Sequence, residues 1–398
     1  MSPSLLRSTV ILGLLAALGP ASIDMYLPAL PSIAEDLGSP VGAVQMTLAA
    51  YFLGFGVSQL VYGPIADQVG RKPPLYAGLA IFAIASIVCA LAPTVEVLLA
   101  ARVAQGIGGG AAMVVPRAIV RDQYTGVEAT RLMGLMMMVV SVSPMIAPLA
   151  GSGVMLLGGW QGIFFALGAG ALLGLLMIGF LYPETLDEND RVPFNKKTFL
   201  GGTRLLLTDG PFMIPTLICG FCMASFFVFV ASASFVYTGQ FGLSPTGFGL
   251  AFALNGVGFF FATQAAAGIG ARLGMARMVT LAILGFVLLM LTLLTVIALG
   301  FGTLPMLIGF LFLGNACLGL VIPTTMVLAL ERHGEIAGLA SSLGGTLQMM
   351  VVGGMIALAS PFFDGTATPM IASILACGLF ALVLTRLNAT QDPVHQPG

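Results

Sequence analysis

Apolar runs of membrane-spanning length recur along the whole chain, and this feature limits the possible folds more than any motif. A helix that crosses the hydrocarbon core of a bilayer needs about 20 predominantly apolar residues. Of the 398 residues, 58% are hydrophobic and only 8% are charged, whereas soluble proteins carry roughly 25% charged residues. So few charged side chains cannot cover a water-exposed surface. The composition therefore predicts an all-α membrane protein, and the net charge of −1 gives no bias toward nucleic acid.

Twelve transmembrane helices are predicted when the apolar runs are divided at charges and at Pro and Gly clusters. A polar stretch at 183–210 separates six runs from six others, and Val114-Val115-Pro116 recurs as Val321-Ile322-Pro323. This repetition predicts two pseudo-symmetric six-helix bundles, a recurrent transporter plan. We expect an N-terminal bundle at 1–185, a cytoplasmic loop at 186–208 and a C-terminal bundle at 209–398. The predicted spans are 8–29, 43–66, 74–93, 96–118, 132–157, 162–182, 211–238, 246–270, 275–299, 303–330, 336–361 and 368–387.

The basic residues give an independent test of this threading. Every Lys and Arg except Arg102 and Arg117, which lie inside a span, falls on one side of the predicted membrane. The loops on the other side hold only acidic charges: Glu35, Asp36, Glu96 and Asp364. Because Lys and Arg accumulate in cytoplasmic loops, the basic side is predicted to be cytoplasmic. Both termini then lie in the cytoplasm and the number of spans is even.

The loop after the second predicted span, residues 63–72, combines glycines with charges. Gly63 and Gly70 allow a tight turn and close helix approach, and Asp67 and Arg71 can form a charge-assisted pair at the membrane face. A plain cytoplasmic turn is the alternative interpretation. The pattern G-x-x-x-D-x-x-G-R-K resembles the signature loop of the major facilitator superfamily, which implies that fold for the two predicted bundles.

Arg102 lies inside the fourth predicted span. An arginine within a span is costly and usually faces a cavity or a carboxylate, although one near a helix end can instead extend its side chain toward the interface. The pattern Arg102-x-x-Gln105-Gly106-x-Gly108 resembles the fourth-span motif of the superfamily, which is associated with proton-coupled members.

Asp24, in the first predicted span, is the only carboxylate well within an apolar run. Burial raises the pKa of a carboxyl group and a nearby cation lowers it, so such a group can exchange a proton as its surroundings change. Asp24 and Arg102 lie at similar predicted depths, and the two could meet across the bundle. The alternative is an Asp that caps a broken helix end near Pro28 and Pro31.

The fifth predicted span carries a proline-containing segment at 143–152. It resembles a softened form of the antiporter motif G-x-x-x-G-P-x-x-G-G, with Pro144, Pro148 and Gly151 present and with Ser or Ala at several glycine positions. Small residues around a proline permit a bend and close packing of helices. The resemblance points to export but does not secure the direction.

Three further segments narrow the resemblance to the Bcr/CflA drug-resistance branch of the superfamily. They are 24–31, 116–122 at the end of the fourth span, and 334–342 entering the eleventh. Members are bacterial inner-membrane drug:proton antiporters related to bicyclomycin and chloramphenicol exporters. The resemblance implies that Asp24 couples protons or substrate, with Arg102, Tyr26 and Gln105 as candidate partners. It also implies that Asp67, Arg71 and Asp122 form a cytoplasmic gate.

Polar and aromatic residues within the spans are candidates for a cavity lining. We select Tyr51, Phe227, Tyr237, Asn255, Asn315 and Gln348. Single Asn and Gln residues can equally form hydrogen bonds between helices, and an aromatic run can equally face lipid. Both alternatives stay open for these residues.

A proton-coupled multidrug exporter working by alternating access is the predicted function, with an exporter or proton-coupled importer of an endogenous metabolite or siderophore as the alternative. The glycine-rich segment at 106–110 lacks the Gly-Lys-Ser/Thr ending of a nucleotide-binding loop, so an ion gradient must supply the energy. We expect no cofactor, no metal and no enzymatic activity. The expected partners are protons, a small amphiphilic drug and the lipid bilayer, with the chain acting as a monomer in the bacterial inner membrane.

Overall fold

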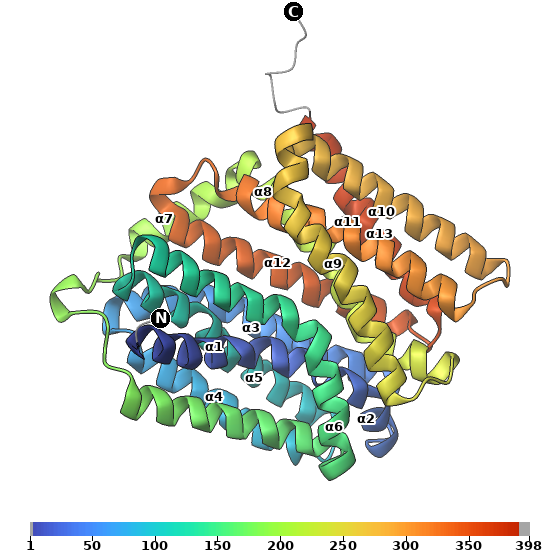
Figure 1. The fold of residues 1–398 in the computed structure, drawn as a ribbon, viewed down its shortest axis with the longest axis horizontal. Helices are drawn as coiled ribbons and strands as arrows, with labels where there is room; N and C mark the ends of the chain where they lie inside the picture. Colours follow the sequence, from blue (N-terminus) through green and yellow to red (C-terminus); the bar gives the residue numbers. More distant parts are fainter. Residues whose placement is uncertain (1–2, 390–398) are drawn as a thin grey trace, which may run out of the picture. The chain divides into compact units, whose positions relative to one another are not determined.

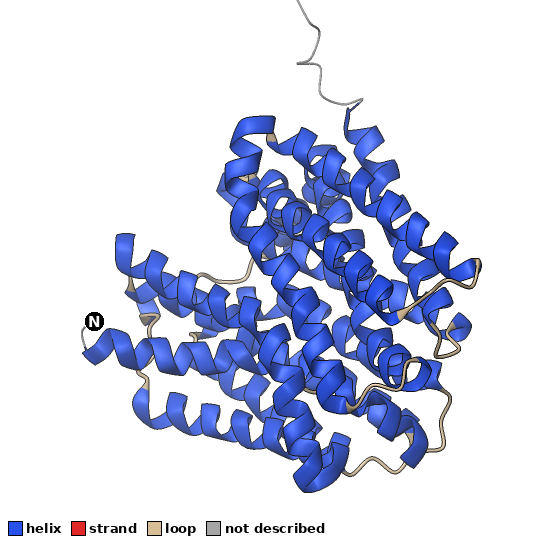
Figure 2. Ribbon diagram, turned by 45° about the vertical axis from the view of Figure 1, so that its right-hand side comes forward, coloured by secondary structure: helices blue, strands red, loops and turns tan. Residues whose placement is uncertain are grey.

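The computed structural model describes residues 3–389, and every regular element in that range is helical (Figure 2). The chain divides into two compact units, the first ending at Lys196 and the second beginning at Lys197. Figure 1 shows the helices of the first unit in blue to green and those of the second in yellow-green to red. The predicted all-α class is confirmed, because no strand occurs in the described part of the chain.

The first unit is built from long helices joined by short turns. Its helices are α1 (Pro3–Asp24), α2 (Leu30–Asp36), α3 (Val41–Val69), α4 (Lys72–Ala90), α5 (Val95–Gln123) and α6 (Gly126–Leu181), with the 3-10 turns η1 (Leu27–Ala29) and η2 (Glu188–Asp190). Gly70, with φ of +99°, makes the sharp turn between α3 and α4, a conformation that costs glycine little.

The second unit repeats this construction. It contains α7 (Lys196–Thr208), α8 (Gly210–Ser234), α9 (Pro245–Leu273), α10 (Met275–Ala298), α11 (Leu304–Leu330), α12 (Ala337–Ala359) and α13 (Ala367–Ala389), with the short segments η3 (Phe235–Gln240), η4 (Gly334–Ile336) and η5 (Ser360–Phe362). The stretch 186–208, expected to be a loop, therefore contains the helix α7, whose charged and apolar residues alternate with helical spacing.

Eleven helices among the described residues are long and apolar enough to cross a membrane, one fewer than the twelve predicted spans. The difference lies in α6, which covers the predicted spans 132–157 and 162–182 as one element of 56 residues. At 1.5 Å per residue, such a helix would measure about 84 Å, far more than a hydrocarbon core of about 30 Å. Gly158 and Gly159 have non-helical backbone angles, so α6 consists of two helices joined at this kink.

Helix contacts follow the same pattern in the two units. In the first, α3 packs on α5, α4 on α5, and α1 and α4 on α6. In the second, α9 packs on α11, α10 on α11, and α8 and α10 on α13. The weak sequence repeat thus corresponds to a repeat of helix packing within each unit.

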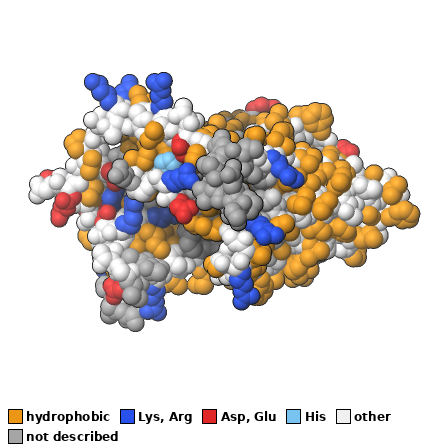
Figure 3. Space-filling view, turned by 90° about the horizontal axis from the view of Figure 1, so that it is seen from above, with side chains coloured by type: hydrophobic (Ala, Val, Ile, Leu, Met, Phe, Trp, Pro, Cys, Tyr) orange, Lys and Arg blue, Asp and Glu red, His pale blue; other side chains and the backbone are white. Residues whose placement is uncertain are grey.

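Large apolar side chains are widely exposed, as lipid contact requires. Leu156, Leu157 and Phe180 of α6 are each more than 80% exposed. In Figure 3, hydrophobic side chains cover broad areas of the face in view. A soluble protein rarely exposes apolar patches of this extent, so the surface agrees with a bilayer environment.

Candidate functional site

Arg102 is the centre of a buried polar cluster in the first unit. Its side chain has no exposed surface, so it does not extend to the interface. The Nη1 group donates to the backbone oxygen of Ser22 at 3.1 Å and to Gln105 Oε1 at 2.6 Å. Gln105 in turn donates to Ser86 Oγ at 2.8 Å. The cluster therefore joins α5 to α1 and α4.

Three aromatic rings surround the Arg102 guanidinium. Its Cζ lies 4.6 Å from the ring centre of Tyr26, 4.5 Å from that of Tyr51 and 5.9 Å from that of Phe164. A desolvated cation–π contact contributes about 2 kcal/mol or more. Tyr26 is fixed by a 2.8 Å hydrogen bond between its hydroxyl and Thr47. These rings surround a buried cation that has no acidic partner among residues 3–389.

Asp24 ends α1 and is buried, with 4% of its surface exposed. Its carboxylate accepts a hydrogen bond from Ser143 of α6 at 2.9 Å. The expected meeting with Arg102 is wrong for this structure, because no ion pair joins them within residues 3–389. The alternative prediction was an Asp that caps a broken helix end. The helix α1 does end at Asp24, but no side chain caps η1 or α2. The break turns this carboxylate toward α6.

The antiporter-motif segment of α6 packs against this break. A Cβ atom on Gly151 would overlap the backbone oxygen of Met25, the residue after Asp24. Pro148 is buried and its backbone oxygen accepts from Ser152 at 2.9 Å, whereas the side chain of Pro144 lies outside those that the structure describes. Gly151 and Ser143 thus fix the helix end that carries Asp24.

A second charge cluster surrounds Arg71, between α3 and α4. Arg71 binds both oxygens of Asp122 on α5, through Nε at 2.6 Å and Nη2 at 3.0 Å, and donates from Nη1 to Asp67. Burial lowers the pKa of Arg71, but the hydrogen bonds to Asp122 and Asp67 outweigh it and raise the pKa overall. The predicted gate residues Asp67, Arg71 and Asp122 therefore meet. Gly63 contacts nothing that would exclude a side chain.

The two acids of this cluster are expected to contribute unequally. The Asp122 side chain is 17% exposed and binds Arg71 through two hydrogen bonds, whereas that of Asp67 is 49% exposed. Asp122→Asn should lower the free energy of unfolding by about 3 kcal/mol because it breaks a largely buried pair. Asp67→Asn should cost less than about 1 kcal/mol, as for an exposed pair. Thermal unfolding in detergent measures the difference, and equal losses would contradict it.

Glu184, which the sequence did not single out, caps the N-terminus of α4. Its carboxylate accepts from the backbone N–H groups of Arg71 at 2.9 Å and Lys72 at 3.0 Å. Burial raises the pKa of Glu184, but these backbone donors outweigh it and bring the pKa below its usual value. Lys72 Nζ also donates to the backbone oxygen of Tyr182 at 2.8 Å. The segment after α6 thus holds the turn that carries Arg71. An acid directly after Pro183, at the end of the sixth predicted span, was the available signal.

Removing this cap should destabilise the first unit. Glu184→Ala leaves helix N–H groups without an acceptor. We expect the free energy of unfolding, measured by thermal unfolding in detergent, to fall by about 1–2 kcal/mol. Glu188→Gln is the matched control, since Glu188 is 87% exposed and lies 3.9 Å from Arg191. Because the folded-state pKa of Glu184 is depressed, its contribution is complete above the ordinary carboxyl pKa and is lost as the pH falls through the folded value. If the difference in unfolding free energy between the wild type and Glu184→Ala changed near pH 7, this assignment would be contradicted.

Two of the predicted lining residues of the second unit, Asn255 and Asn315, contact each other. Asn315 donates to Asn255 across α11 and α9 at 3.5 Å, and Asn255 also donates to Ala251 of its own helix at 2.9 Å. This is the contact expected from the interhelical alternative. Tyr237 is buried between Phe229 and Phe248, Phe227 packs on Phe226, and Gln348 is buried in α12. Their role as a cavity lining stays a prediction.

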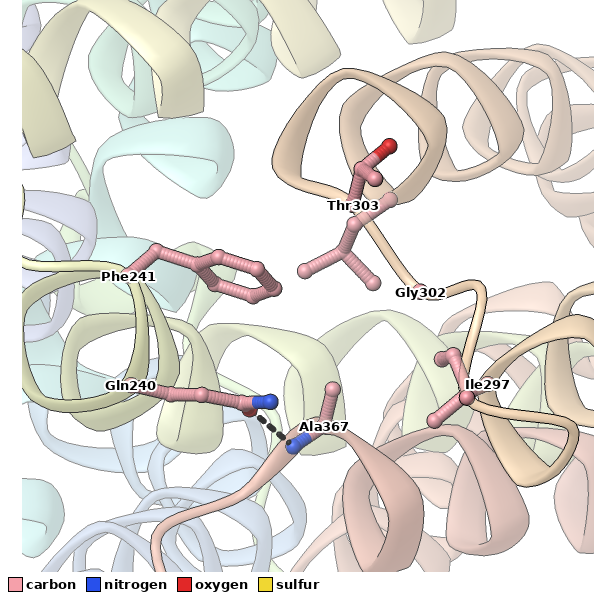
Figure 4. Close-up of a pocket in the computed structure, with 8 residues that line it drawn as sticks. Gln240, Phe241, Ile297, Gly302, Thr303 and Ala367 are labelled. Atoms are coloured by element: carbon pink, nitrogen blue, oxygen red, sulfur yellow. Dashed lines mark hydrogen bonds between the residues drawn. The ribbon is translucent and has the colours of Figure 1, made fainter.

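A small pocket of about 190 Å³ lies in the second unit (Figure 4). Gln240 and Phe241 line it at the end of η3, opposite Thr303, and Gln240 accepts from the backbone N–H of Ala367 at 2.7 Å. None of its lining residues carries a charge. The pocket therefore has no group that could exchange a proton. Within residues 3–389, no group of three His, Cys, Asp or Glu residues is placed to hold a metal ion.

Comparison with known proteins finds membrane transporters that are similar to this chain over most of its length. The model of the family described as Major Facilitator Superfamily matches residues 12–358. An uncharacterized MFS-type transporter of Bacillus subtilis is 35% identical over 362 residues, which cover 90% of each chain. A bicyclomycin resistance protein homolog of Haemophilus influenzae is 29% identical over 372 residues, covering 94% of this chain and 93% of the relative.

Solved structures share the fold. The crystal structure of a D-xylose-proton symporter has a TM-score of 0.75 and covers 96% of each chain at 17% sequence identity. At this identity the likeness establishes the arrangement of helices and carries no information on substrate.

Proposed function

The chain belongs to the major facilitator superfamily, and on this premise we propose that it exports amphiphilic drugs in exchange for protons. The predicted family and fold class are confirmed, and the chain is a multi-pass membrane transporter, not an enzyme. We place it in the bacterial inner membrane with both termini in the cytoplasm, because its relatives are bacterial and its basic residues lie on one side. The energy source is the proton gradient, with no cofactor.

The observation that carries the proposal is the environment of Asp24. This carboxyl is buried within a membrane helix, and its one described hydrogen bond comes from the hydroxyl of Ser143. Arg102, which we expected to pair with Asp24, instead makes cation–π contacts with Tyr26 and Tyr51. A buried carboxyl that is not locked in an ion pair can take up and release a proton when its surroundings change. Alternating access supplies that change of surroundings.

The drug part of the proposal rests on a relative that is named for bicyclomycin resistance. The test is transport in proteoliposomes, with an imposed proton gradient as the only energy source. We expect uptake of bicyclomycin or chloramphenicol into vesicles that are acidic inside, and no uptake without a gradient. If neither drug is transported while a metabolite or siderophore is, the alternative cargo replaces the drug in the proposal. If drug accumulates only when it moves with the proton flow, the protein is an importer.

A further inference from the structure

The guanidinium of Arg102 has one edge without a protein partner. Nε and Nη2 are both buried, and neither has a hydrogen-bond acceptor within the described residues. Only Nη1 is occupied, by Ser22 and Gln105. A buried donor without an acceptor is costly, and more so on a charged group.

Arg71 of the same chain shows what this edge is suited to bind. Its Nε and Nη2 donate to the two oxygens of one carboxylate, that of Asp122, while its Nη1 takes a separate partner. The Nε–Nη2 edge of arginine matches the two parallel lone pairs of a carboxylate. Arg102 therefore offers buried donors with the geometry of a carboxylate site.

Aromatic rings surround the guanidinium and set the chemistry of a ligand that suits it. Tyr26 and Tyr51 lie within 4.6 Å of the guanidinium centre, so apolar ring surface lies beside the donors without a partner. A planar oxyanion attached to an apolar body could place its oxygens on the edge and its body against the rings. The environment favours an aromatic or other apolar acid over a small inorganic anion.

The charges inside the spans favour the same sign of ligand. The interior charges of the first unit are Asp24, Arg102 and Arg117, an excess of cations that grows when Asp24 is protonated. In the second unit, the charged residues of the described spans lie at helix ends, as Arg272, Arg277 and Arg386. Asp24 is the one acid in the interior of the spans that the structure describes, and its carboxylate accepts a hydrogen bond from Ser143.

We propose that the Nε–Nη2 edge of Arg102 binds a carboxylate of the transported substrate, so that the preferred cargo is an amphiphilic organic anion and lipophilic cations are disfavoured. This inference rests on the proposed function, because it names the substrate class of the same site. Export of an anion in exchange for protons moves positive charge inward, so a membrane potential that is negative inside would also drive it.

The test measures binding to the purified full-length protein by calorimetry, with no gradient. The probes are 4-tert-butylbenzoate, 4-tert-butylbenzamide and 4-tert-butylbenzylammonium, which share one apolar body and differ in charge. We expect the carboxylate to bind at least about 10-fold more tightly than the amide or the ammonium, as a charge-assisted bidentate contact predicts. Arg102→Lys keeps the charge but lacks the edge, and should remove most of this preference. Arg117→Lys is the matched control and should keep it.

Three results would overturn the inference. One is equal or tighter binding of the ammonium, and a second is a carboxylate preference that survives in Arg102→Lys. The third is a preference that is absent in wild type and emerges in Asp24→Asn, because Asp24 itself would then be the group that occupies the edge. Proton-driven transport is measured separately, in proteoliposomes. If the wild-type protein shows the carboxylate preference but no gradient-driven transport, the antiport proposal is refuted and the binding inference stands.

Discussion

Asp24→Asn should abolish proton-driven transport while leaving substrate binding nearly unchanged. Asn has the shape of Asp and its side-chain oxygen can still accept from Ser143, which lies 2.9 Å from the Asp24 carboxylate, but it cannot take up a proton. In proteoliposomes with an imposed gradient, the initial rate of accumulation should fall to that of protein-free vesicles. Binding to the detergent-solubilised protein should change by less than about 3-fold, since no charge-assisted bond to Arg102 is lost.

Glu35→Gln is the matched control for this experiment. Glu35 lies on α2, only a short distance along the chain from Asp24, but its side chain is exposed. Gradient-driven transport by Glu35→Gln should equal that of the wild type. Full transport by Asp24→Asn would refute the coupling assignment, and loss of binding in that variant would show that Asp24 holds substrate instead of a proton.

The sequence was sufficient to predict the fold class and the unusual charges. Apolar runs of span length and the one-sided basic residues depend on local composition and on the membrane, so they can be read without knowledge of tertiary contacts. Asp24 and Arg102 stood out because charges within apolar runs are costly. The prediction of Asp67, Arg71 and Asp122 as one cluster rested on a family resemblance, and the structure brings these residues together.

Tyr26 and Gln105 were grouped with Asp24 and Arg102 by resemblance, and both contact Arg102, but the kind of contact that each charge makes could not be predicted. Arg102 is stabilised by Tyr26 and Tyr51, which lie far away in the sequence, and nothing in their local pattern distinguishes a cation–π partner from an apolar packing residue. We expected opposite charges to meet, but the break of α1 turns Asp24 toward Ser143. Ser143 was considered only as a small replacement for glycine, although its hydroxyl is the donor that this carboxylate uses.

The sequence likewise did not show which glycines of α6 pack closely against another segment. Gly151 and Gly153 lie on one helix two residues apart, and only the resemblance to the antiporter motif distinguishes them in the sequence. A Cβ on Gly153 would meet nothing within 4 Å, whereas one on Gly151 would lie 2.9 Å from the Cα and the carbonyl carbon of Met25 and closer still to its oxygen. The contact is to the backbone of the turn that follows α1, so no side chain can rotate away to relieve it.

Gly151→Ala should therefore cause a large loss of both stability and transport. To admit a methyl group, α6 and the end of α1 must separate, and overpacking that shifts the backbone typically costs about 1–3 kcal/mol. The displaced backbone begins one residue after Asp24, so the hydrogen bond from Ser143 should weaken as well. We expect a clear fall in the melting temperature in detergent and a transport rate below about one tenth of the wild-type value.

Gly153→Ala provides the opposite expectation on the same helix. It fills open space, and replacing a helical glycine with alanine stabilises a helix by up to about 1 kcal/mol. Its melting temperature should equal or exceed that of the wild type, with transport retained. Since the two substitutions add the same methyl group, a difference between them can come only from what that group meets. If both variants behave alike, the packing of α6 on the end of α1 does not position Asp24, and the antiporter-motif segment must act in another way.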